Sequence, residues 1–193
     1  EGTHKYIGGG EESFGWLGYD AVRDKCAPSA ICLICEIAAY AKDQGISLYD
    51  YLLNIYKEFG FQRETTINVV RPGKAGAEEI QQMMANYRQN PPKEIAGEKV
   101  IRIKDYKSLV EKDFVDGEWR EQPITMALNA TSNVLQFFTD GGLKVSVRPS
   151  GTEPKIKFYF EIPADMPTTA DYKAATAAAE ARVPAIKASL GLE

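Results

Sequence analysis

The sequence predicts an α+β fold, in which an antiparallel sheet packed by helices forms the C-terminal part of the chain. Apolar residues recur at helical spacing in the first third of the 193 residues and again at the end. Between positions 100 and 162 they alternate with polar residues in several short segments, as half-buried strands do. Two of these segments flank Asp140-Gly141-Gly142, which is typical of a hairpin turn.

The first third of the chain predicts a helical hairpin. Residues 28–45 carry apolar side chains at helical spacing, which predicts a buried helix that Ser29 caps. A second helix follows and ends at Gly60. Ser47 and Asp50, three positions apart, have the spacing of a capping box at its start.

The helical pattern gives way to a polar bridge at residues 62–65, and we place a domain boundary there, between residues 1–62 and 63–193. The predicted elements of the second domain are strands over 67–70, 100–103, 134–138, 143–147 and 156–162 and helices over 77–88 and 170–190. Pro184 is expected to kink or split the last helix.

Composition narrows the classes of partner. The formal net charge is −4 and basic residues are spread along the chain, so the sequence gives no sign of nucleic-acid binding. No apolar run is long enough to span a membrane. The three cysteines, Cys26, Cys32 and Cys35, lie in or just before one predicted helix, which argues against a disulfide framework and favours the reducing cytoplasm. With a single histidine in the chain, we expect no metal site.

The connection between the last two strands, RPSGTEP, is rich in hydrogen-bond donors. Arg148 offers a planar fork that matches two phosphate oxygens, Ser150 and Thr152 offer hydroxyls, and Gly151 lets backbone amides approach an anion. Residues of these types also make an ordinary polar turn, and their spacing does not decide between the two interpretations.

A second polar loop lies near the start, in IGGGEESFG. Glu11 and Ser13 could accept and donate hydrogen bonds to the hydroxyls of a sugar, or belong to a glycine-rich surface turn. His4 is a candidate proton carrier at neutral pH. Lys25, in the run Arg23-Asp24-Lys25, could steady a phosphate or transfer a proton, or belong to a solvated charge cluster.

Taken together, GGEESFG and RPSGTEPKIKFY resemble the sugar-recognition loop and the phosphate-binding loop of the α-D-phosphohexomutase family, in the family's order. The resemblance implies that Glu11 and Ser13 bind sugar hydroxyls and that Lys25 and His4 lie near the reacting centre. It also implies a set of residues that bind the phosphate that is not transferred: Arg148, Ser150, Gly151 and Thr152. Cys26 stands where family members commonly have aspartate.

The resemblance also implies an architecture. Residues 63–193 would form the family's fourth domain, which is similar to the TATA-box-binding protein, and residues 1–62 a helical remnant of its α/β third domain. The phosphoserine motif T-A-S-H-N-P and the metal motif D-G-D-x-D-R do not occur in the sequence. We therefore expect a C-terminal portion that is inactive alone.

In the whole cytoplasmic enzyme, a phosphoryl group would move between positions 1 and 6 of a hexose through glucose 1,6-bisphosphate. Mg²⁺ would be bound by a domain missing from this chain. The implied partners are hexose phosphates and the missing N-terminal domains of the same parent chain, with no nucleic acid and no membrane. Three alternatives stay open: a phosphopentomutase, a phosphoglucosamine mutase and a non-catalytic module that binds phosphosugars.

Overall fold

A computed structural model describes residues 6–10, 15–18, 22, 24–124 and 131–192. The chain divides into two compact units, Glu1–Phe59 and Gly60–Glu193. The division follows Phe59, whereas the sequence placed a domain boundary after Gln62.

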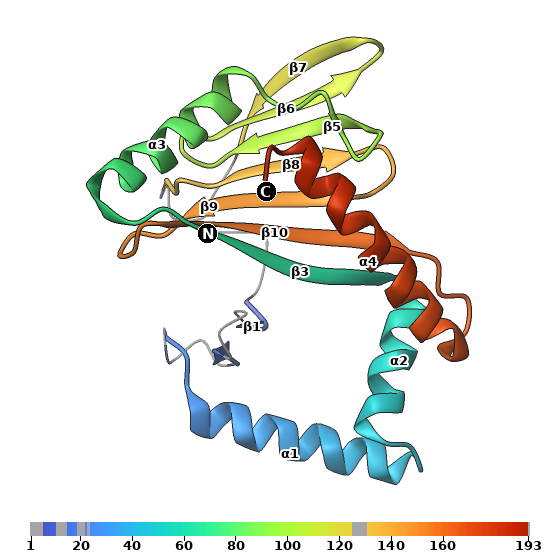
Figure 1. The fold of residues 1–193 in the computed structure, drawn as a ribbon. Coiled ribbons are helices and arrows are strands. Elements are labelled where there is room, and N and C mark those ends of the chain that lie inside the picture. Colours follow the sequence, from blue (N-terminus) through green and yellow to red (C-terminus); the bar gives the residue numbers. More distant parts are fainter. Residues whose placement is uncertain (1–5, 11–14, 19–21, 23, 125–130, 193) are drawn as a thin grey trace. The chain divides into compact units, whose positions relative to one another are not determined.

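The first unit holds a short hairpin and two helices (Figure 1). Its elements are β1 (Gly9–Gly10), which pairs antiparallel with β2 (Trp16–Leu17), and the helices α1 (Ala27–Asp43) and α2 (Leu48–Phe59). The predicted capping box is present at the start of α2. The Asp50 carboxylate accepts hydrogen bonds from the Ser47 amide (3.1 Å) and hydroxyl (2.6 Å), and the Asp50 amide donates to the same hydroxyl (3.1 Å).

Two expectations for α1 are wrong. Cys26, not Ser29, occupies its N-cap position, and the Ser29 hydroxyl donates to the Cys26 carbonyl from inside the first turn (2.9 Å). The helix is also not buried, since Ile31 and Ile34 are 62% and 58% exposed. Among the described elements of this unit, the hairpin and α2 contact α1 without covering its apolar face.

The second unit is built on one antiparallel sheet in the strand order β3-β10-β9-β8-β5-β6-β7, with β4 paired to β5. The strands are β3 (Phe61–Val70), β4 (Glu94–Ile95), β5 (Glu98–Asp105), β6 (Val110–Val115), β7 (Glu118–Pro123), β8 (Leu135–Thr139), β9 (Lys144–Pro149) and β10 (Lys155–Ala164). The predicted α+β class and the hairpin across Asp140-Gly141-Gly142 are confirmed.

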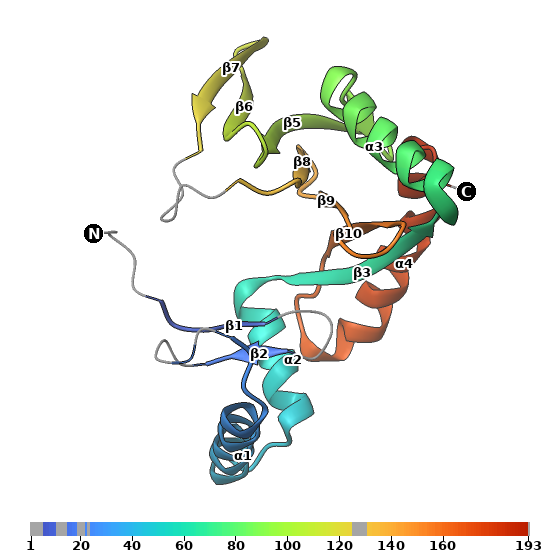
Figure 2. The same ribbon diagram turned by 90° about the vertical axis from the view of Figure 1, so that its left-hand side faces the viewer.

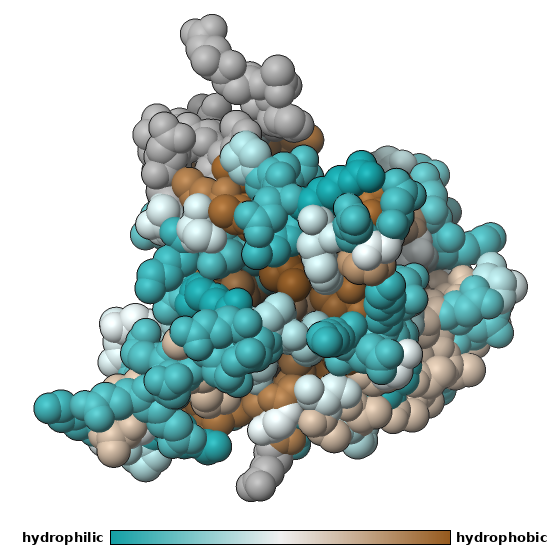
Figure 3. Space-filling model, turned by 90° about the horizontal axis from the view of Figure 1, so that it is seen from above, coloured by the Kyte–Doolittle hydropathy of each residue, from teal (hydrophilic) through white to brown (hydrophobic). Residues whose placement is uncertain are grey.

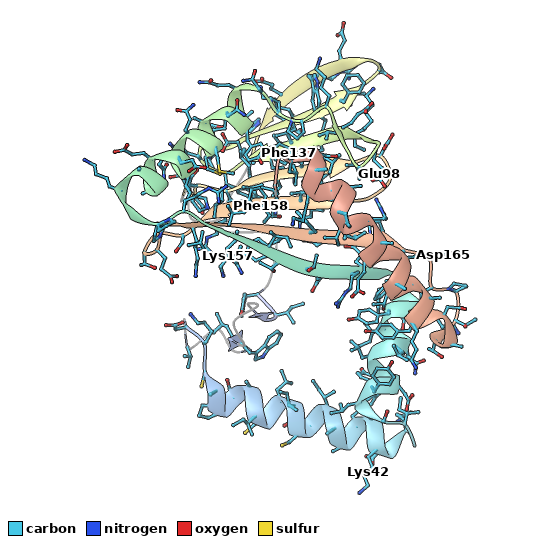
Figure 4. The ribbon with its side chains drawn as sticks, viewed as in Figure 1. Lys42, Glu98, Phe137, Lys157, Phe158 and Asp165 are labelled. Atoms are coloured by element: carbon cyan, nitrogen blue, oxygen red, sulfur yellow. The ribbon has the colours of Figure 1, made fainter. Side chains whose placement is uncertain are left out.

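Two helices cover one face of this sheet, as Figures 1 and 2 show. They are α3 (Gly73–Gln89) and α4 (Tyr172–Ser189), the latter preceded by a short 3-10 turn (Thr169–Asp171). Alternation along the strands builds the core. In β10, Ile156, Phe158, Phe160 and Ile162 are fully buried, and the residues between them lie on the opposite face. From α3, the ring of Tyr87 packs on Phe137 and Phe158, with centroids 6.2 and 6.1 Å apart (Figure 4).

Three features of this unit differ from the prediction. The expected polar bridge at residues 62–65 is part of β3, because these residues pair with residues 160–163 of β10. The β6–β7 hairpin was not predicted. Finally, α4 runs through Pro184 as one helix, without the predicted split.

None of the helices in the described part of the chain combines the length and the apolar character that crossing a membrane requires. The face of the molecule seen in Figure 3 is mostly hydrophilic, with apolar residues exposed in the hollows between polar ones.

Candidate functional site

The RPSGTEP loop connects β9 to β10 at the end of the sheet where β3 leads into α3 (Figure 1). The Ser150 amide donates to the Lys155 carbonyl (2.9 Å) and closes the loop. Inside it, the Ser150 hydroxyl accepts two long hydrogen bonds, from the amides of Thr152 (3.4 Å) and Glu153 (3.3 Å). The loop is therefore organised around one of the residues predicted to bind phosphate.

Arg148 is exposed on the sheet face that lies opposite α3 and α4. Its guanidinium group forms no hydrogen bond or ion pair with any residue that the structure describes. Lys157 of β10 is its direct cross-strand partner, and its position near the loop is visible in Figure 4. Like charges in directly opposed positions destabilise a sheet, so an anion bound between them would be favourable.

The acidic residue of the loop is paired with the first lysine of β10. Glu153 pairs with Lys155, with 2.5 Å between the carboxylate and the ammonium group. This hydrogen bond, helped by the charge of Lys155, lowers the pKa of Glu153 below its usual value. Glu153 is thus held as a carboxylate by Lys155, and it forms no ion pair with Arg148.

Gly151 is not required by the loop's own packing. Its φ angle does not lie in the left-handed region, and a Cβ atom built there would have nothing within 4 Å. The space beside its backbone is open, which is the condition for close approach of an anion to backbone amides.

The sugar loop of the first unit is only partly described. His4, Glu11 and Ser13 lie outside the described residues. The glycines that flank the loop pack against an indole ring. A Cβ atom at Gly8 or Gly10 would lie 3.1 Å from the ring of Trp16, and one at Gly18 would lie 2.6 Å from its nitrogen. These glycines thus make room for Trp16, a role that the sequence alone does not indicate.

Lys25 lies just before α1. Its ammonium group is 3.2 Å from the Asp24 carboxylate, which also accepts a hydrogen bond from the Lys25 amide (2.7 Å). These backbone and side-chain hydrogen bonds, with the charge of Lys25, lower the pKa of Asp24. The geometry is that of an exposed ion pair, and the proposed catalytic role of Lys25 stays a prediction.

A cavity of about 430 Å³ lies far along the sheet from the loop, between the end of α3 and strands β5 to β7. Its charged side chains are already paired: Arg88 with Asp105 (3.1 Å) and Lys112 with Glu121 (2.6 Å). Paired charges offer a phosphate little, and we place the candidate site at the loop.

Comparison with known proteins identifies the family to which these features belong. Residues 67–179 match the family described as phosphoglucomutase/phosphomannomutase, C-terminal domain. The chain belongs to this family. The family that the two sequence motifs indicated is thus confirmed by this match.

Curated relatives support this membership. The chain is 36% identical over 163 residues to the phosphoglucomutase of Staphylococcus haemolyticus strain JCSC1435, covering 84% of this chain and 29% of the relative. It is 38% identical over 153 residues to that of Staphylococcus aureus strain N315, covering 79% and 26%. The chain therefore spans less than a third of the length of these relatives.

A solved structure shows the same fold. It is the open form of the exocytosis-sensitive phosphoprotein pp63/parafusin from Paramecium, which is also described as a phosphoglucomutase. The TM-score is 0.55 with 21% identity, and the match covers 96% of this chain and 31% of parafusin.

The phosphohexomutase motif left one residue of the site unrecognised. Lys157 was seen only as part of an alternating strand, because its place opposite Arg148 depends on the register between β9 and β10. The signal was the period-two pattern Lys155-Ile156-Lys157, which puts both lysines on the face of Arg148 once the hairpin is closed.

Proposed function

We propose that this chain binds a hexose phosphate and forms the substrate-binding C-terminal part of a phosphoglucomutase or phosphomannomutase. The main support for the proposal is the pair Arg148 and Lys157. These two cations lie in opposed positions on β9 and β10, next to a loop that is rich in hydrogen-bond donors. The names of the curated relatives support phosphoglucomutase.

Each residue of the loop has a role in this proposal. Arg148 binds two oxygens of the phosphate that is not transferred, and Lys157 offsets its remaining charge. The hydroxyls of Ser150 and Thr152 and the amide of Gly151 donate to the same group. Glu11 and Ser13 bind hydroxyls of the sugar.

In the whole enzyme we propose a transfer in two steps. A phosphoserine outside this sequence gives its phosphoryl group to a free hydroxyl of the hexose phosphate, and Lys25 or His4 takes the proton of that hydroxyl. The resulting glucose 1,6-bisphosphate turns over and returns its other phosphoryl group to the serine. The loop must therefore bind a phosphate at either end of the sugar, which charge and hydrogen bonds achieve without a closely fitted sugar pocket.

The residues described here do not fit the Mg²⁺ that the family implies, since no three His, Cys, Asp or Glu side chains gather among them. We assign no step on this chain to the metal and propose that another part of the enzyme binds it. We also propose that the chain alone is inactive and that the enzyme works in the reducing cytoplasm, where the three free cysteines stay reduced.

The competing substrates are a pentose phosphate and a glucosamine phosphate. Assays of a longer protein that contains this sequence would separate them, since phosphate transfer within glucose phosphate, ribose phosphate and glucosamine phosphate can be followed in parallel. A longer protein that binds glucose phosphates but isomerises none would favour the non-catalytic module.

Calorimetric titration with glucose 1,6-bisphosphate tests the binding proposal. We expect the wild-type chain to bind and Arg148→Ala to lose roughly tenfold or more in affinity, since a charge-assisted hydrogen bond is lost. Arg120→Ala is the matched control, because it removes an exposed arginine from β7 at the far edge of the same sheet. Equal affinities for wild type and Arg148→Ala, or no binding by the wild type, would contradict the proposal.

A further inference from the structure

The loop is held at its exit by a residue from another part of the unit. Arg71 follows β3, and its backbone amide donates to the carbonyl of Pro154, the last residue before β10 (2.9 Å). The pairing of β3 with β10 ends at Val70 and Lys155, and this bond extends it by one hydrogen bond toward the loop. The path of the loop backbone therefore depends on where the Arg71 peptide lies.

The position of the Arg71 backbone is in turn restricted by α3, on the carbonyl side of the residue. A Cβ atom at Gly76, in the first turns of α3, would lie 1.9 Å from the Arg71 carbonyl oxygen and 2.3 Å from its carbonyl carbon. These are backbone atoms, which cannot rotate away as the end of a side chain can. The Arg71 side chain also contacts α3, because its Nε donates to the Glu79 carboxylate (2.8 Å).

Alanine normally replaces a glycine inside a helix with a gain in stability. At Gly76 the opposite is expected, because the added methyl group would push α3 and the Arg71 peptide apart. Gly151 in the loop has open space beside it, whereas Gly76 in α3 is packed closely against the Arg71 backbone.

We infer that Gly76 is a positioning residue for the phosphate-binding loop, acting through the backbone of Arg71, whose carbonyl lies against Gly76 and whose amide donates to Pro154. The inference rests on the proposed function of the loop, and it adds a residue that does not touch the ligand. Because a misplacement of about 1 Å can cost roughly a hundredfold in catalytic rate in other sites, we expect a comparable shift of the loop exit to weaken phosphate binding as well.

Amide hydrogen exchange and calorimetry on the full chain test this inference together. In Gly76→Ala we expect the Arg71 amide to exchange roughly tenfold faster relative to the amides of the β10 core. We expect affinity for glucose 1,6-bisphosphate to fall by a similar factor.

Gly141→Ala is the matched control. A Cβ atom there would also clash, at 2.3 Å from the Glu98 side chain, but in the β8–β9 turn at the opposite end of β9. Its Arg71 exchange and its affinity should stay within about twofold of the wild type, in keeping with the additivity of distant sites. The inference is overturned if Gly76→Ala leaves Arg71 exchange unchanged, or if Gly141→Ala weakens binding as much.

If Gly76→Ala does not fold, amide exchange in the wild type can still test the inference. Saturating glucose 1,6-bisphosphate should slow exchange at Arg71 as well as at Ser150, because binding to the loop stabilises the bond to Pro154. Protection of Ser150 without Arg71 would overturn the inference. Failure of the wild type to bind at all would contradict the proposed function, and the exchange of Arg71 in Gly76→Ala would still decide whether Gly76 holds the loop.

Discussion

Arg148 of β9 and Lys157 of β10 occupy directly opposed positions on the sheet face opposite α3 and α4. Like charges in opposed positions destabilise a sheet, and a bound phosphate would relieve that repulsion. In the proposed function, the pair would therefore exchange a little stability for affinity toward an anion.

A charge reversal at Lys157 should separate these two effects. In Lys157→Glu the opposed pair becomes attractive, so we expect the free energy of unfolding to rise by about 0.2–1 kcal/mol. Affinity for glucose 1,6-bisphosphate should fall, because a carboxylate would compete with the ligand for Arg148. Urea unfolding measures the free energy of unfolding, and calorimetry measures the affinity. If the variant binds as well as the wild type, Lys157 does not contribute to ligand binding.

Asp105 should make stability depend on acid pH. Burial alone would raise its pKa, but hydrogen bonds from Arg88 and from the Lys107 amide outweigh burial and lower it. Because the folded pKa is the lower one, this stabilisation is present above the ordinary aspartate pKa of about 3.9 and is lost as pH falls through the folded value.

The isosteric variant Asp105→Asn tests this dependence. A hydrogen bond to a charged group is stronger than a neutral one, so the variant should be about 1 kcal/mol less stable than the wild type at pH 7. The difference should shrink toward pH 3, as urea unfolding at both values would show. A difference that stays constant with pH would show that the charge of Asp105 contributes nothing.

Tyr87 should make stability depend on alkaline pH. Its hydroxyl donates to the Leu190 carbonyl (2.6 Å), and burial raises its pKa to about 12. A raised pKa means that the stabilisation is complete below the ordinary value near 10 and is lost as pH rises toward 12. Tyr87→Phe should be less stable by about 1–3 kcal/mol at neutral pH, since the Leu190 carbonyl loses its partner. Absorbance titration of the phenol would give the pKa, and a value near 10 would contradict the burial argument.

Pro184 should be a site where substitution stabilises the chain. It lies inside α4 and is exposed, so it lowers helix stability without filling the core. We expect Pro184→Ala to raise the free energy of unfolding by up to about 3 kcal/mol, the usual difference between these residues in a helix. Unchanged or lower stability in thermal unfolding would mean that α4 is shaped around the proline.

The elements that were predicted correctly are those whose sequence pattern lies within the element itself. The capping box at Ser47 and Asp50 and the alternation of β8, β9 and β10 are local patterns, and the structure follows them. The hairpin of β6 and β7 was missed because its strands are rich in charged residues. Its turn does carry a signal, Asp116-Gly117, and both residues have positive φ angles of 54° and 87°.

Other features depend on contacts distant in sequence. Residues 62–65 are polar, yet they complete β3 because β10 offers partners along its whole length, and Arg63 reaches Glu180 of α4 (2.8 Å). Likewise, the loop at Arg148 was predicted from its flanking strands, whereas Lys157 and Gly76 required the register and the packing of α3.

The most direct measurement is a site-resolved titration of the ¹⁵N-labelled chain with glucose 1,6-bisphosphate by NMR. Saturable shifts are expected in the amides of Ser150, Gly151 and Thr152 and in the guanidinium of Arg148, while amides around the cavity at Trp119 should stay unchanged. Shifts confined to that cavity, or no shifts in the loop at saturating ligand, would contradict the claim that this loop binds the phosphate of a sugar.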